Sequence, residues 1–71
     1  MGEAWERTLF GAMRAQQQQA MVCRRLAEEA RRRGDERAAE RFDRRAWDYE
    51  EGAATVRQLI ARGGDGEPEE G

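Results

Sequence analysis

The sequence predicts an all-α fold in which two long helices form an antiparallel hairpin. Both halves of the chain are rich in the strong helix formers Ala, Arg, Glu, Gln and Leu. In each half, apolar residues recur at alternating spacings of three and four, which is the heptad pattern of packed helices. Gly34 and Asp35 lie between the halves, and these residue types favour a helix end followed by a helix start. A fold at this point brings the two apolar stripes face to face.

The first helix is predicted over residues 3–33. Arg31, Arg32 and Arg33 fall in its last turn, where cations interact favourably with the helix dipole. Gly34 follows, and glycine readily adopts the left-handed conformation that ends many helices. The predicted inner stripe of this helix consists of Trp5, Leu9, Ala12, Gln16, Gln19, Cys23, Leu26 and Ala30.

The second helix is predicted over residues 36–62, after a turn at residues 34–35. Asp35 suits the N-cap, and Glu36 places a carboxylate in the first turn. Residues 63–71 carry four carboxylates, no base and no large apolar residue, so this acidic tail is predicted to be disordered. The predicted inner stripe of the second helix consists of Ala39, Phe42, Ala46, Tyr49, Ala53, Val56 and Ile60.

A tight turn at Gly34 fixes which residues of the two stripes meet. In some of the expected layers, such as Gln16–Ala53 and Ala12–Val56, a larger side chain lies opposite a small one, so that these layers can interdigitate. The expected layers are Ala30–Ala39, Leu26–Phe42, Cys23–Ala46, Gln19–Tyr49, Gln16–Ala53, Ala12–Val56 and Leu9–Ile60.

The apolar surface is wider than one helix–helix contact can cover. A chain of 71 residues with 38% hydrophobic residues also builds only a small core by itself. We therefore expect self-association, with a homodimer that forms a four-helix bundle of the coiled-coil type, or a helical protein partner. Phe10 and Trp47 lie outside both stripes and are predicted to mark a second contact surface. The residues that flank the two stripes are Met13, Ala15, Ala20, Val22 and Ala27 in the first helix, and Ala38, Gly52 and Leu59 in the second.

The sequence contains few of the residue types that carry out catalysis. Histidine is absent, which removes the commonest general base, the commonest metal ligand and every Ser-His or Cys-His nucleophile pair. We expect no enzyme activity, no cofactor and no metal site. Cys23 on the inner stripe is interpreted as a buried structural thiol, since a reactive thiol would need exposure. Gln16 and Gln19 are interpreted as a polar layer that fixes the register, with a ligand pocket in the bundle core as the alternative.

Charge is distributed unevenly along the chain, although the net charge is only −2. All 13 basic residues are arginine, and nine of them lie in residues 24–45 around the turn. Six carboxylates are interleaved with them, which leaves a charge of +3 for this segment. Pairs such as Glu28–Arg32 and Glu40–Arg44 have the favourable i, i+4 order. We expect an ion-paired helix surface. The alternative is a nucleic-acid-associated or regulatory protein in which the arginine-rich turn contacts phosphates.

The sequence also predicts where in the cell the protein is located. No apolar run approaches the roughly 20 residues that span a membrane, and no signal-peptide pattern opens the chain. The single cysteine excludes an internal disulfide. We expect a cytoplasmic protein that does not bind membranes.

One resemblance adds to this reading. The stretch from Cys23 to Ala46 is an arginine- and alanine-rich helix that breaks at Gly34 and is followed by Phe42, and the segment Val56–Ile60 follows later. With Trp5 and Leu9, these features resemble the helical hairpin appended to the C-terminus of some bacterial chemotaxis-type protein-glutamate methylesterases. The likeness covers about residues 5–60 and includes no part of the catalytic domain. It implies a bacterial protein with an accessory interaction role.

Overall fold

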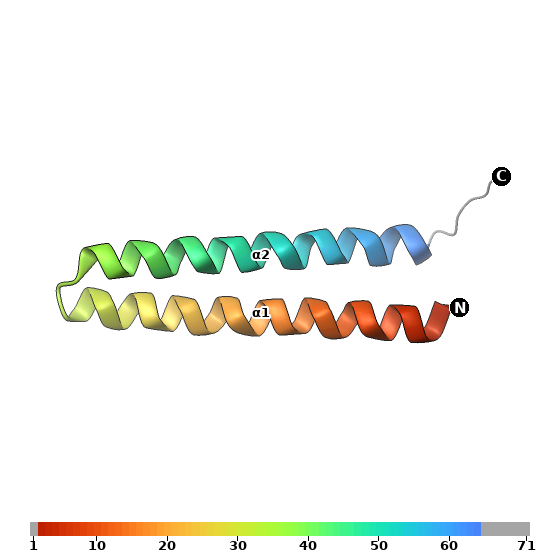
Figure 1. Cartoon of the computed structure of the whole chain (residues 1–71), viewed down its shortest axis with the longest axis horizontal. Coiled ribbons are helices and arrows are strands. Elements are labelled where there is room, and N and C mark those ends of the chain that lie inside the picture. Colours follow the sequence, from red (N-terminus) through yellow and green to blue (C-terminus); the bar gives the residue numbers. More distant parts are fainter. Residues whose placement is uncertain (1, 65–71) are drawn as a thin grey trace.

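The protein is an antiparallel hairpin of two helices, as the sequence predicts (Figure 1). The computed structural model describes residues 2–64, with side chains described for residues 3–63. Helix α1 spans Gly2–Arg32 and helix α2 spans Glu36–Gly64. The two helices lie side by side along their whole length in Figure 1. The all-α hairpin fold is therefore confirmed.

The turn joins two cap motifs within three residues. Gly34 has a φ of 81°, the left-handed conformation that favours glycine. The amide of Gly34 donates to the carbonyl of Arg31 at 2.9 Å, and the amide of Asp35 donates to the carbonyl of Ala30 at 2.8 Å. This pair of bonds is a Schellman motif. The Asp35 carboxylate in turn accepts a hydrogen bond from the amide of Ala38 at 3.1 Å, which caps α2.

The helix bounds differ slightly from the predicted ones. Helix α1 begins one residue before the predicted start and ends one residue before the predicted end. Helix α2 continues through the two glycines at positions 63 and 64, where the sequence predicted its end at residue 62. A Cβ added to Gly63 would lie 3.8 Å from the indole nitrogen of Trp5, so the start of α1 lies beside this last turn. The rest of the predicted disordered tail, residues 65–71, lies outside the described residues.

The core between the helices is made almost wholly of alanine. Two clusters are prominent, one of Ala20, Cys23 and Ala46 against Tyr49, and one of Ala30, Ala38 and Ala39 against Phe42. Within the described residues, no large side chain is fully buried. The buried residues are Leu9, Ala20, Cys23, Ala27, Ala30, Ala38, Ala39, Ala46 and Ala53.

The predicted inner stripe of α2 and the observed one agree, but the stripe of α1 differs. Ala20 and Ala27 are buried where Gln19 and Leu26 were expected, and Leu26 is 37% exposed. Met13 is half-buried and Ala12 is exposed. Alanines on this stripe leave room for the rings of Tyr49 and Phe42, whereas a Leu26–Phe42 layer would crowd two large side chains together. The inner stripe of α1 is Leu9, Met13, Gln16, Ala20, Cys23, Ala27 and Ala30.

The hairpin is a single layer of helices, with Cα extents of 56 × 19 × 10 Å. Both of its broad faces are therefore open to solvent along their whole length. Within residues 2–64, neither helix contains a stretch that is long and apolar enough to cross a lipid bilayer.

Candidate interaction surfaces

The two broad faces of the hairpin are distinguished by the residues next to Cys23. Successive residues of a helix are rotated by about 100°, so Val22 and Arg24 project to opposite sides of the buried Cys23. On α2, Asp48 and Glu50 flank the half-buried Tyr49 in the same way. Arg24 contacts Glu50, so these two residues share one face, and Val22 and Asp48 share the other.

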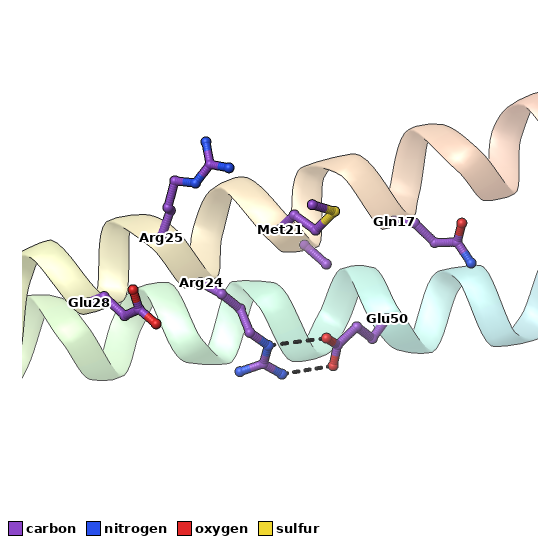
Figure 2. A pocket seen from close by; sticks show the side chains of 7 residues that line it. Gln17, Met21, Arg24, Arg25, Glu28 and Glu50 are labelled. Carbon is purple, nitrogen blue, oxygen red and sulfur yellow. Dashed lines mark hydrogen bonds and ion pairs between the residues drawn. The ribbon is translucent and has the colours of Figure 1, made fainter.

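The first face is held together by ion pairs between the helices. Arg24 reaches across to α2 and donates two hydrogen bonds to the Glu50 carboxylate, at 2.8 and 3.1 Å (Figure 2). Arg31 donates to Asp43 at 2.6 Å. Longer contacts join Arg24 to Asp43 at 3.6 Å and Arg31 to Glu36 at 3.9 Å. We call the side of the hairpin that carries these five residues the ion-paired face.

These contacts shift the titration of the groups involved. The hydrogen bond from Arg24, helped by its positive charge, holds the pKa of the Glu50 carboxyl below its usual range. The same hydrogen bond raises the pKa of Arg24, and the hydrogen bond to Asp43 raises the pKa of Arg31. Since Arg24, Arg31 and Glu50 are exposed and Asp43 is only partly buried, solvent screens the pairs, and they orient the helices more than they stabilise them.

The sequence predicted an ion-paired surface but not this pattern of pairs. Within residues 2–64 the ion pairs join α1 to α2, and neither Glu28–Arg32 nor Glu40–Arg44 is among them. The signal that could have found the observed pairs is the hairpin register, which brings Arg24 and Arg31 near carboxylates of α2.

An open groove lies on the ion-paired face beside Arg24. Figure 2 shows Arg24 turned toward Glu50, while Arg25 points away from α2. Met21, which is 63% exposed, lies on the same side of α1. Two of the four charged residues that line this groove, Arg24 and Glu50, already bind each other. The groove is lined by Gln17, Ala20, Met21, Arg24, Arg25, Glu28 and Glu50.

The opposite face carries a long row of uncharged residues on α1. Val22 is 48% exposed and Trp5 is 55% exposed, and Leu26 lies in the same row. The hydroxyl of Thr8 donates to the carbonyl of Ala4 at 3.0 Å and so is already satisfied. All members of the row are exposed and recur at alternating spacings of three and four. We call this row the uncharged stripe: Trp5, Thr8, Ala12, Ala15, Gln19, Val22 and Leu26.

On the same face, α2 is apolar near the open end of the hairpin and charged near the turn. Leu59 and Gly52 lie on this side, and a Cβ added to Gly52 would come within 2.8 Å of the Gln16 amide. Gln16 therefore packs over Gly52 on the inner stripe rather than forming a polar layer with Gln19, which is exposed. Nearer the turn, α2 presents Arg41 and Arg45.

The structure does not bring together the two residues predicted to form a second surface. Phe10 lies on α1 and Trp47 on α2, and both are about half exposed. Trp47 lines a separate groove with carboxylates and an arginine of α2, in which Phe10 takes no part.

Cys23 is buried between Ala20 and Ala46, and this position shields its thiol from solvent. Tyr49 packs against this cluster rather than forming the predicted layer with Gln19. Residues 2–64 contain no group of three or more Cys, Asp or Glu side chains arranged to hold a metal ion.

Comparisons with known proteins identified no match to this chain. No family model matches this sequence, and neither a curated protein nor a solved structure matches it. The resemblance to the methylesterase-associated hairpin therefore stays a prediction from sequence pattern.

Proposed function

We propose that this protein is a non-catalytic association module that pairs with a second copy of itself into a four-helix bundle. The observation that carries the proposal is the placement of the large apolar side chains. Trp5, Phe10, Met21, Val22, Leu26, Trp47 and Leu59 are exposed, while the buried core consists of small residues apart from Leu9.

The energetics of burial favour association. A buried CH₂-sized group contributes about 0.8 kcal/mol, whereas a fully buried Leu, Val or Phe contributes about 1.5–3 kcal/mol. The hairpin buries mainly alanine methyl groups, so much of the burial energy available to this sequence is unused in the single chain. A second hairpin can cover the remaining apolar surface at the shallow crossing angles typical of helix bundles.

The alternative role, phosphate binding by the arginine-rich turn, receives less support. Two of the nine arginines in residues 24–45, Arg24 and Arg31, are engaged by carboxylates of α2 and do not project freely toward a polyanion. The residues that line the groove on the ion-paired face include no thiol, hydroxyl or imidazole, which favours a binding role over a catalytic one.

Sedimentation equilibrium at micromolar concentration tests the proposal. We expect a mass of twice the 8.2 kDa chain. A monomeric mass, in a sample whose circular dichroism shows a fully helical fold, would contradict self-association. A salt titration of nucleic-acid binding runs beside it, because a steep salt dependence would favour the alternative role.

A further inference from the structure

We propose that the interface of this dimer is the uncharged stripe of α1, which packs against the same stripe of a second copy in antiparallel orientation. This inference rests on the proposed function and deepens it, since it names the face, the partner helix and the register.

The distribution of charge indicates which face of the hairpin forms the proposed interface. The stripe from Trp5 to Leu26 contains no charged residue over seven consecutive heptad-type positions, and all seven are exposed. The opposite side of the hairpin carries Arg24, Arg31, Asp43 and Glu50. Covering that side would remove these charges from water, at a desolvation cost that ion pairs often fail to recover. The uncharged stripe itself adds no charge to an interface, and the charged residues on its side of the hairpin, Arg41, Arg45 and Asp48, belong to α2.

The stripe is self-complementary when a second copy is turned end for end. An axis at the level of residue 17 places Leu26 opposite Thr8 of the second copy, and Val22 opposite Ala12 of the second copy. In each layer a large side chain meets a small one, which suits knobs-into-holes packing. The third layer pairs Gln19 with Ala15 of the second copy, so the two Gln19 amides lie on either side of the axis.

Polar groups on the stripe fit this arrangement. Apart from Trp5, whose indole N–H is a donor, Gln19 is the residue of the stripe whose side chain needs new hydrogen bonds, because the Thr8 hydroxyl is already bonded within α1. Near the axis, two Gln19 amides can bond each other. A single polar layer of this kind fixes the register of paired helices.

The other two-fold arrangement fits less well. If both turns lie at the same end, α1 packs against α2 of the second copy. Leu26 then lies at the level of Arg41 and Val22 at the level of Arg45, as the hairpin register dictates. Apolar side chains would cover guanidinium groups, and burial of a charge without a partner is costly. In the contact of α1 with α1 of the second copy, Val22 and Leu26 face Ala12 and Thr8 instead.

Mixed single-cysteine variants test the register. Cys23→Ala removes the native thiol from an alanine-rich core, and either Thr8→Cys or Leu26→Cys is added to it. In the proposed dimer, residue 8 of one copy lies beside residue 26 of the other. Two residues 8, or two residues 26, lie about 27 Å apart, because each is nine residues from the axis and a helix rises about 1.5 Å per residue. The two proteins are refolded separately and together, then treated with a short bis-maleimide.

We expect cross-linked dimer in the mixture and at most a small fraction of that yield from either variant alone. Circular dichroism and sedimentation establish that each variant is folded and dimeric. Equal cross-linking in the separate and mixed samples would overturn the register, as would folded dimers that show no cross-linking in the mixture. A wild-type monomer would instead overturn the proposed function, so the two failures are distinguishable.

Discussion

The two faces of the hairpin use the same helix in different ways. On the ion-paired face, Arg24 and Arg31 are satisfied by carboxylates of the same chain. On the other face, Val22 and Leu26 project from the uncharged stripe without a covering partner in the single chain. Ion pairs within the chain therefore join the helices on one face, and the other is the face that the proposed dimer would cover. The proposal thus depends on how the exposed apolar residues are arranged, and not on their number.

The largest effect is expected from placing a charge on each face in turn. Val22→Glu introduces a carboxylate into the proposed interface, and we expect the dimer to weaken on the order of 100-fold, because burying an unpaired charge costs several kcal/mol. Met21→Glu is the matched control, since Met21 is the neighbouring residue, is 63% exposed and lies on the ion-paired face. Sedimentation should report a monomer for Val22→Glu and a dimer for Met21→Glu. The reverse pattern would assign the interface to the ion-paired face.

A smaller effect is expected on the ion-paired face, and it depends on pH. The pKa of Glu50 is lowered in the folded protein, so its contribution to stability is present above the pKa of the unfolded chain, about 4.3. This contribution is lost as the pH falls through the lower folded pKa. Glu50→Gln should therefore unfold at lower urea concentration than the wild type at pH 7, with the gap closing toward pH 3. A gap that persists at pH 3 would show that the side chain acts through packing and not through charge.

The turn and the second helix could be predicted from the sequence because their signals are local and unambiguous. Gly34 and Asp35 have the chemistry of a left-handed helix end and an N-cap, and the structure shows both. On α2, Phe42 and Tyr49 are large residues in one narrow row, so only one inner stripe is possible there.

The stripe of α1 could not be predicted correctly from spacing alone. Two heptad rows run side by side on this helix, and the predicted stripe took alternate residues from each. Leu9, Gln16, Cys23 and Ala30 belong to the inner stripe, whereas Trp5, Ala12, Gln19 and Leu26 belong to the uncharged stripe. Spacing does not separate the rows, because both are uncharged and adjacent. The bulk of Phe42 and Tyr49 on the facing helix decides which row lies inside.

Which residues form ion pairs could not be predicted from the order of charges in the sequence. The order of charges along one helix favours pairs such as Glu28–Arg32, but the long arginine side chains select carboxylates across the hairpin instead. That choice depends on how the helices are rotated about their axes, which in turn depends on the inner stripe of α1.

A dilution series followed by methyl NMR tests the central claim most directly, because it uses the unaltered protein and reports on both faces at once. As the dimer dissociates, we expect the methyl signals of Val22 and Leu26 to shift with the loss of their neighbours, while the Met21 methyl stays in place. If the Met21 signal moved and those of Val22 and Leu26 did not, the uncharged stripe would not be the interface.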